Sequence, residues 1–460
     1  ATPAPTATPA PTATPAPTAT PISGAYYVAT TGNDSNAGTG SSPWLTLQKA
    51  ANTVPAGGIV YVRGGTYTGF TISRSGLDAT KPTSFLAYPG DTRPVVAANG
   101  RVDVIKVSAS HDIVLRGFTI QGAAGGGGSG AGIRVENGST RIAIRGNIIQ
   151  NNHSYGINIS SSTAVIVDGN EIAHNEEGVY VSRLGDGVQI TNNQIHHQDK
   201  MVVNTSTIVN DDHGAVGIAF VRTTGSILAS GNQLWANRAA SYDYGWDGGA
   251  FEIYSASNVT MAYNITWDNE NILETGSDGT LGCANNVFRH NVSYGATSVG
   301  RSFGMFLRCA YNMTVANNVF HNLDQFVFSV TSGNGLWDGS IDSLKIENNV
   351  AVMASGKIIG IESSLPSTVI IDRNLFDNTS GGYIGSVAGK GSTSSLATFI
   401  SWTGQMKLGI DANPMFVNPG AHDYHVQLGS PVVDRGVVLF GTTVPYFGSA
   451  PDLGRFETAP

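Results

Sequence analysis

Two glutamates near the middle of the chain have the residue type and the spacing for acid and base chemistry. Glu252 lies twelve residues before Asn264, and Glu274 lies twelve residues before Asn286. The two asparagines belong to a repeating pattern, so equal offsets place the acids side by side on neighbouring strands. Each Glu follows an apolar residue, and strand alternation turns both to the outer face. Paired carboxyl groups suit glycoside cleavage, in which one protonates the leaving oxygen and the other is nucleophile or base.

Two arginines follow the acids in an insertion between repeats. Arg308 lies ten residues before Asn318, which places it one strand beyond Glu274 and beside Gly276. Because the glycine leaves a gap, we expect the guanidinium to reach the Glu274 carboxylate. Arg301 precedes it in the same insertion.

Two long insertions precede the strand that carries Glu252. They include residues 197–213 and 241–249. Loops on one face of a repeat protein often carry the binding function, and their aromatic rings can stack on sugars. Asp247 lies five residues before Glu252, in a Gly-rich turn that leaves room for a ligand. The expected substrate-binding residues are Trp246, Tyr254, Tyr244, Tyr242, Tyr180, Arg301, Asp243 and His213.

An acidic cluster in the first insertion is compatible with a metal site. Asp211 and Asp212, together with Asp186 one repeat earlier, offer the oxygen ligands that Ca²⁺ prefers. The same side chains are suited to forming turns through hydrogen bonds to the backbone. Glycoside cleavage by two carboxyl groups requires no cofactor, so a Ca²⁺ site would point instead to a polysaccharide lyase.

Three functions fit these residues. The first is a glycoside hydrolase that uses Glu252 and Glu274 on a plant or microbial polysaccharide or its oligosaccharides. The second is a Ca²⁺-dependent polysaccharide lyase, whose base would be an Arg because no Lys occurs between Lys200 and Lys345. The third is a non-catalytic glycan-binding protein, in which the outward acids form only a solvated ladder.

A repeated unit of strands and turns must position these residues. Nine asparagines, most of them followed by short apolar segments, recur at intervals of 23, 23, 39, 32, 22, 32, 31 and 25 residues. They are Asn147, Asn170, Asn193, Asn232, Asn264, Asn286, Asn318, Asn349 and Asn374. A base period of 22 to 23 residues predicts an all-β, single-stranded parallel β-helix, with three short strands in each coil. A second polar row lies five residues further on and comprises Asn152, Asn175, Gln198, Asn237, Asn269 and Asn291.

The character of the sequence changes at both ends of this solenoid. Residues 1–22 repeat Ala, Thr and Pro, which predicts a disordered linker. Residues 23–410 are expected to form the β-helix domain, with a short helix over residues 45–54 that covers its first coil. Residues 411–460 break the period and are expected to form an irregular C-terminal cap. Because such linkers tether modules, we expect a carbohydrate-binding module before the linker in the native protein.

Composition and charge exclude several classes of protein. The 460 residues include 58 Gly, and only 13% are charged, which excludes a coiled coil or a helical bundle. The net charge of −8 without a basic stripe argues against a nucleic acid partner, and no apolar run is long enough to span a membrane. We expect a secreted, extracellular monomer. Cys283 and Cys309 either form a bridge or remain free thiols.

Short motifs near the N-terminus resemble those of known secreted enzymes. Residues 27–29 (YVA), 31–34 (TGND) and 64–67 (GGTY), with the Asn repeat and the C-terminal ending, resemble family 9 pectate lyases and family 120 glycoside hydrolases. The resemblance covers residues 25–460 and implies a right-handed β-helix and a carbohydrate-active enzyme. Family 120 implies Asp247 and Glu274 as the alternative catalytic pair, although WDGGAFEIY and NILETG depart from its motifs. Family 9 implies the Asp cluster as a Ca²⁺ site.

Overall fold

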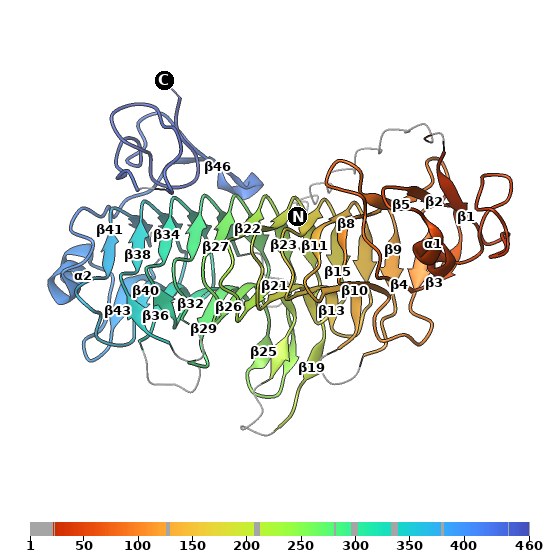
Figure 1. The fold of residues 1–460 in the computed structure, drawn as a ribbon. Helices are drawn as coiled ribbons and strands as arrows, with labels where there is room; N and C mark the ends of the chain where they lie inside the picture. Colours follow the sequence, from red (N-terminus) through yellow and green to blue (C-terminus); the bar gives the residue numbers. More distant parts are fainter. Residues whose placement is uncertain are drawn as a thin grey trace, which may run out of the picture.

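A computed structural model gives the fold of the chain as a long solenoid (Figure 1). The structure describes residues 22, 24–125, 129–206, 212–279, 282–295, 302–332, 339–378, 381–439 and 441–459. Residues 1–21 of the expected linker, Asp211 and Arg301 lie outside this set. Three long sheets run the length of the solenoid, and each coil contributes one strand to each sheet. Apart from the last strand of the second sheet, all neighbouring strands in these sheets are parallel, which confirms the predicted parallel β-helix.

The first sheet contains thirteen strands. They are β1 (Tyr26–Val28), β2 (Ile59–Val62), β5 (Thr83–Ala87), β8 (His111–Arg116), β11 (Thr140–Arg145), β14 (Ile166–Asp168), β17 (Val188–Thr191), β22 (Ile227–Ser230), β27 (Val259–Ala262), β30 (Val287–Arg289), β34 (Thr314–Ala316), β38 (Lys345–Glu347) and β41 (Ile370–Asp372).

The second sheet also contains thirteen strands, including the two that carry the candidate acids. They are β4 (Phe70–Ile72), β7 (Ile105–Ser108), β10 (Ala131–Glu136), β13 (Tyr155–Ser160), β16 (Glu177–Ser182), β21 (Val216–Val221), β26 (Gly249–Tyr254), β29 (Asn271–Gly276), β32 (Phe303–Leu307), β36 (Phe326–Val330), β40 (Lys357–Ile361), β43 (Tyr383–Val387) and β44 (Gly391–Thr393).

The third sheet contains twelve strands. They are β3 (Thr66–Thr68), β6 (Val95–Ala97), β9 (Thr119–Gln121), β12 (Ile148–Gln150), β15 (Glu171–Ala173), β18 (Gln194–His196), β23 (Gln233–Trp235), β28 (Ile265–Trp267), β31 (Val292–Tyr294), β35 (Val319–His321), β39 (Val350–Val352) and β42 (Leu375–Asp377). Four two-stranded pairs lie outside the three sheets: β19 (Met201–Val203) with β20 (His213–Gly214), β24 (Ala239–Ser241) with β25 (Gly245–Asp247), β33 (Ala310–Tyr311) with β37 (Ile341–Asp342), and β45 (Phe416–Asn418) with β46 (Asp423–Val426).

Stacked side chains fill the space between the sheets. Inward positions carry Ile, Val, Leu and Phe that are almost fully buried, and they form one continuous core along the axis. At the turns, buried asparagines form a ladder in which each side-chain amide donates to the Oδ1 atom of the next coil, as Asn147 does to Asn170 at 3.0 Å. The amides also bond to backbone groups, so they satisfy polar atoms that the coil turns would otherwise bury without partners.

The predicted ladder is wrong at one coil. Asn264 donates to Asn291, and Asn291 donates to Asn318, so Asn291 belongs to the first ladder and not to the second polar row. Asn286 instead accepts from the Val259 amide of the preceding coil. The five extra residues of this coil lie in the turn between β29 and β30.

Both ends of the solenoid are covered. Helix α1 (Leu47–Thr53) begins at Thr46, whose side chain accepts from the Lys49 amide, and it buries its apolar face at the N-terminal end, as expected. At the other end the covering element is α2 (Leu396–Thr403), which buries Phe399 against β43. Among the described residues, no helix is long and apolar enough to cross a membrane.

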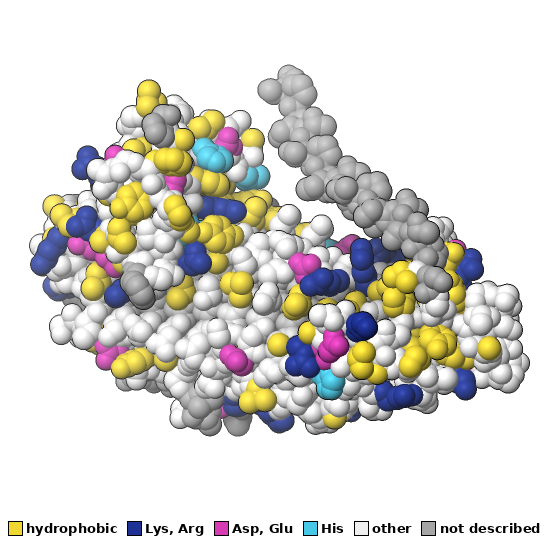
Figure 2. Space-filling view, turned by 45° about the horizontal axis from the view of Figure 1, so that its top comes forward, with side chains coloured by type: hydrophobic (Ala, Val, Ile, Leu, Met, Phe, Trp, Pro, Cys, Tyr) yellow, Lys and Arg dark blue, Asp and Glu magenta, His cyan; other side chains and the backbone are white. Residues whose placement is uncertain are grey.

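The C-terminal segment takes a position that the sequence did not predict. Instead of closing the last coil, the residues after about 411 fold back along the flank of the solenoid, where they include the short helix η1 (Pro419–Ala421) (Figure 1). The Asn317 amide donates to the Asp452 carbonyl, and the Tyr424 ring packs near His321. Leu428 is exposed on this segment. Figure 2 shows hydrophobic side chains on the surface of the part of the molecule that projects from the solenoid.

The two cysteines form a disulfide. Cys283 and Cys309 lie 26 residues apart, with their Cα atoms 5.6 Å apart, and both are buried. The bridge joins the turn after β29 to the residue that follows Arg308. It therefore resolves the alternative between bridged and free thiols that the sequence left open.

Candidate active site

Glu252 and Glu274 lie directly beside each other. The pairing of β26 with β29 aligns the two residues, and the same register aligns Phe251 with Leu273 in the core. Neighbouring strands in a sheet are about 4.8 Å apart, so the two outward side chains begin at that separation. The predicted stacking of the two acids is confirmed.

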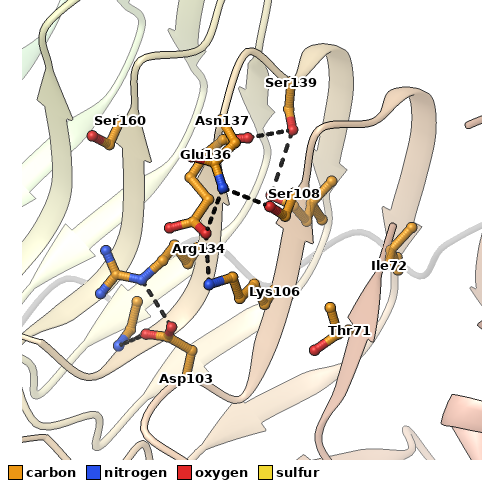
Figure 3. A network of polar contacts seen from close by, with 12 residues as sticks. Thr71, Ile72, Asp103, Lys106, Ser108, Arg134, Glu136, Asn137, Ser139 and Ser160 are labelled. Carbon is orange, nitrogen blue, oxygen red and sulfur yellow. Dashed lines mark hydrogen bonds and ion pairs between the residues drawn. The ribbon is translucent and has the colours of Figure 1, made fainter. Parts of the chain in front are cut away.

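The outer face of the second sheet changes character along the solenoid. In the N-terminal coils its charges form ion pairs between neighbouring coils, with Lys106 2.6 Å from Glu136 and Arg134 2.8 Å from Asp103 (Figure 3). The row of Lys106 and Arg134 continues through Asn158, Tyr180 and Ala219 to Glu252 and Glu274. The row therefore begins with two basic residues, passes through three uncharged ones, and reaches the two acids at the pocket.

Arg308 makes the contact that its position predicted. Its Nη1 atom donates to Glu274 Oε1 at 2.6 Å, and its Cζ atom lies 5.1 Å from the centre of the Phe306 ring. The Thr275 hydroxyl accepts from the backbone amides of Arg308 and Cys309, both at 3.0 Å. Because Cys309 is also bonded to Cys283, two independent restraints hold the backbone that carries the guanidinium.

A pocket of about 330 Å³ opens over the acid pair. Its described lining combines acids and aromatic rings with one arginine and one histidine. The lining comprises Asp212, His213, Gly214, Val216, Tyr244, Trp246, Asp247, Gly248, Gly249, Phe251, Glu252, Tyr254, Glu270, Asn271, Glu274, Gly276, Phe303, Phe306 and Arg308. The size and the lining suit a small polar ligand such as a sugar ring.

One wall of the pocket is built by two hairpins that the long insertions form. The β24–β25 hairpin presents Trp246 and Asp247 to the pocket, and the β19–β20 hairpin presents His213. The hairpins are joined by Asn204, whose side chain donates to the Ala240 carbonyl and accepts from the Tyr242 amide. The two insertions therefore act as one structural unit.

The Asp212 carboxylate is the main connection between these hairpins. It accepts from the Thr205 amide at 2.6 Å, the Ser241 hydroxyl at 3.0 Å, and the amides of Tyr242 at 2.8 Å and Asp243 at 3.2 Å. Burial acts to raise the pKa of Asp212, but these hydrogen bonds outweigh it and hold the pKa below its usual value. The carboxylate thus organises the loop.

The structure does not bring Asp186 and Asp212, two of the three expected Ca²⁺ ligands, together. Asp186 follows the C-terminal end of β16, whereas Asp212 precedes the N-terminal end of the neighbouring parallel strand β21. The two residues therefore lie at opposite ends of these strands. Asp186 Oδ1 accepts from the Ser226 amide at 3.1 Å. No three His, Cys, Asp or Glu side chains within the described residues are placed to hold a metal ion. The grouping of Asp186 with Asp212 was therefore wrong, and Asp211 lies outside the described part.

The expected substrate-binding residues divide into two groups. Trp246, Tyr244, Tyr254 and His213 line the pocket. Tyr242 is 71% exposed on the hairpin tip, Asp243 accepts from the Asp212 amide, and Tyr180 packs against Tyr155 with ring centres 4.8 Å apart. These last three residues are not among those that line the pocket, and Arg301 lies outside the described residues.

The pocket also contains residues that the sequence analysis missed. Glu270 and Asn271 form part of its lining at the start of β29, and Phe303 and Phe306 form part of it on β32. The offset rule could have found Phe306, because it lies twelve residues before Asn318, as Glu252 does before Asn264. The second polar row could have found Glu270, which follows Asn269 as Glu176 follows Asn175.

Two further buried acids lie at the edge of the pocket wall. Glu176 Oε1 is 3.6 Å from His213 Nδ1, and burial raises the pKa of Glu176 to about 7. Burial, together with the charges of Glu176 and Glu252, raises the pKa of Glu177 well above its usual value. The electrostatic influence of Glu252 therefore extends from the acid pair to this wall.

Fold and pocket together define a right-handed parallel β-helix protein with a candidate active site on the outer face of one sheet. Residues 26–290 match the family model described as "Pel9A-like, right handed beta helix region". The chain belongs to this Pel9A-like family, which confirms the resemblance to β-helix carbohydrate-active enzymes.

Two solved structures are similar to this chain in fold, and one curated protein is similar to part of it in sequence. The structure of XylC in complex with xylose has a TM-score of 0.55 at 12% identity and matches 79% of this chain and 86% of its own. Pectate lyase Pel9A has a TM-score of 0.52 at 15% identity and matches 94% of this chain and 96% of its own. The uncharacterized protein YwoF of Bacillus subtilis (strain 168) is 34% identical over 137 residues, which are 28% of this chain and 29% of YwoF.

Proposed function

We propose that the protein is a secreted glycoside hydrolase that cleaves a neutral polysaccharide or oligosaccharide. The observation that carries the proposal is the alignment of Glu252 and Glu274 at the base of a pocket that is large enough for a sugar ring. Two neighbouring carboxyl groups supply both the acid and the nucleophile or base of glycoside cleavage. The rings of Trp246 and Tyr244 offer apolar faces to the substrate.

The contact with Arg308 suggests separate roles for the two acids. The guanidinium stabilises the negative charge of Glu274, which suits a nucleophile or base. Glu252 then serves as the proton donor to the leaving oxygen. Asp247 is the alternative partner of Glu274, and its Oδ1 atom accepts from the Gly248 amide at 2.7 Å.

The charge of the pocket favours a neutral substrate. Its described lining includes five acids but only Arg308 as a permanent cation, and that cation already contacts Glu274. A uronic acid polymer would meet net repulsion there unless a cation bridged it to the protein.

Single substitutions test the hydrolase. We expect Glu252→Gln and Glu274→Gln each to lower kcat by about 100-fold or more on a polysaccharide panel, measured as new reducing ends. Glu362→Gln, which removes a surface carboxylate bound to Lys357, should retain full activity. If both active-site variants keep the wild-type turnover, the assignment is wrong. Asp247→Asn tests the alternative pair in the same assay.

A polysaccharide lyase is the second candidate, and the guanidinium of Arg308 in the pocket is the observation that favours it. A lyase leaves an unsaturated uronide that absorbs ultraviolet light, whereas a hydrolase does not. Ultraviolet and reducing-end assays on the same pectate, with and without chelator, separate the two. Saturable glycan binding without either product would instead support a non-catalytic role.

The remaining expectations concern the whole protein. The Thr/Pro/Ala repeat at residues 1–22 and the Cys283–Cys309 disulfide support secretion, since disulfides persist in oxidising compartments. We propose a monomer, with a carbohydrate-binding module beyond the linker. Detection of the protein in culture medium, and its mass by light scattering, test these two points.

A further inference from the structure

One residue that lines the pocket has a buried polar atom without a hydrogen-bond partner within the described structure. This atom is Oδ1 of Asn271, a residue that is 5% exposed and lines the pocket. The other side-chain atom of the same amide, Nδ2, donates to the Gly248 carbonyl at 2.8 Å. The amide is therefore held in one orientation with its acceptor unused.

Glycine at position 249 makes room for this amide. A Cβ atom added to Gly249 would lie 2.4 Å from Asn271 Oδ1, and the backbone of Gly249 does not have the positive φ that favours glycine. An alanine at this position would therefore displace the Asn271 amide, so glycine leaves it in place by providing space and not by its backbone conformation. Gly248 and Gly249 thus fix the Asn271 amide beside the pocket that all three residues line, on the strand that carries Glu274.

Buried acceptors without partners are uncommon in folded proteins, because each lost its hydrogen bonds to water on folding. An acceptor of this kind inside a pocket indicates a ligand that donates. We propose that Asn271 Oδ1 accepts a hydrogen bond from a ring hydroxyl of the sugar bound beside Glu274, and so selects substrates that carry this hydroxyl. This inference rests on the proposed function and names a specificity residue of the same site.

The choice of a hydroxyl as donor follows from the surroundings. Glu270 and Glu274 line the same pocket, so negative charge there would also favour an ammonium group as the donor. The rings of Trp246 and Phe303 also line the pocket and suit the apolar faces of a sugar. A neutral polyhydroxylated ring satisfies both the acceptor and the aromatic rings.

A double-mutant cycle tests the inference. Binding of D-xylose, D-glucose, D-galactose and L-rhamnose to the whole protein is measured by calorimetry, followed by each monodeoxy derivative of the sugar that binds best. We expect one deoxy derivative to bind wild-type protein at least about 10-fold more weakly. Asn271→Ala should bind the parent sugar as weakly as the wild-type protein binds this deoxy derivative. The variant should bind the deoxy derivative with the same affinity as the parent sugar.

Two more variants keep the test decisive. Gly249→Ala retains Asn271 but displaces its amide, so it should reproduce the selective loss. Asn158→Ala is the matched control, because Asn158 is also buried with an unpartnered Oδ1 but does not line the pocket. It should bind like wild type.

The outcomes separate this inference from the proposed function. Three results would each overturn the role of Asn271: an equal loss of affinity for every deoxy sugar, unchanged sugar binding by Asn271→Ala, or no sugar binding at all. A coupled cycle in a protein that cleaves no glycan would support the Asn271 subsite and refute the hydrolase. An ammonium probe, tris(hydroxymethyl)aminomethane, that bound more tightly than the sugars in an Asn271-dependent manner would also overturn the hydroxyl assignment.

Discussion

The buried carboxyl of Glu176 should make the stability of the protein depend on pH. This side chain is 1% exposed, and burial raises its pKa from 4.5 to about 7 despite hydrogen bonds from the Val202 amide and the Ser154 hydroxyl. The folded state therefore prefers the protonated form, whereas the unfolded chain ionises near pH 4.5. Replacing the carboxyl by an amide in Glu176→Gln removes this difference and keeps an acceptor oxygen in place.

The magnitude follows from the two pKa values. One pKa unit corresponds to about 1.4 kcal/mol, so the shift of Glu176 is equivalent to about 3 kcal/mol. An acid with a raised folded pKa contributes its full stability below pH 4.5 and loses it as pH rises through about 7. Above that pH the wild type must keep a buried charge, so Glu176→Gln should be more stable there by about 3 kcal/mol.

Thermal melts at pH values from 4.5 to 8 provide the assay. The two melting temperatures should differ little at the acid end, and the variant should melt higher by an increasing amount as pH rises. Glu362→Gln removes a carboxylate from the surface ion pair with Lys357 and controls for net charge. A difference between Glu176→Gln and wild type that stays constant over this range would refute the reasoning.

Further substitutions probe the supports of the pocket and of the solenoid. Asp212→Asn should raise KM by about 10-fold and alter tryptophan fluorescence, because an amide cannot accept all the hydrogen bonds that join the hairpins. If KM and the fluorescence stay unchanged, Asp212 does not hold the hairpins together. Because the pKa of Asp212 is lowered in the folded protein, its stabilisation of the hairpins is present above its pKa in the unfolded chain and is lost as pH falls through the folded value. Measurements of activity against pH can follow this loss. Replacing Cys283 and Cys309 by Ser should cost about 3.5 kcal/mol in urea unfolding, from the 26-residue separation, and reductant should then have no further effect. Asn264→Leu should lower the free energy of unfolding by about 3 to 5 kcal/mol, because it leaves buried groups of the ladder unpaired. Asn285→Ala removes an exposed hydrogen bond to Asn258 and should lower it by less than about 1 kcal/mol.

The fold could be predicted because its stabilising interactions recur at a fixed period. Asn rungs and apolar strands repeat in each coil, so nine weak local signals support one another. The position of an insertion within a coil leaves no such signal. Asn286 was placed in the ladder because it lies at the base period from Asn264, whereas the structure uses Asn291. The alignment of Glu252 with Glu274 survived this error because the extra residues follow β29.

The rest of the site depends on contacts that spacing does not encode. Asp212 resembled a Ca²⁺ ligand in sequence because its type and neighbours were acidic. Which donors face its carboxylate depends on how two insertions pack together, and those donors come from Thr205 and from residues 241–243. Asn271 was missed for a related reason, since its role requires the absence of a side chain at Gly249 on the neighbouring strand.

The origin of the pocket residues has an evolutionary consequence. Glu252 and Glu274 lie on strands whose pairing the whole solenoid enforces, whereas Trp246 and His213 lie on hairpins that extend from it. Insertions and deletions in the hairpins would leave the strand register intact. Relatives can therefore change the hairpins that line the pocket without changing the alignment of the two glutamates, and we expect hairpin length to vary more among them than the spacing of these acids.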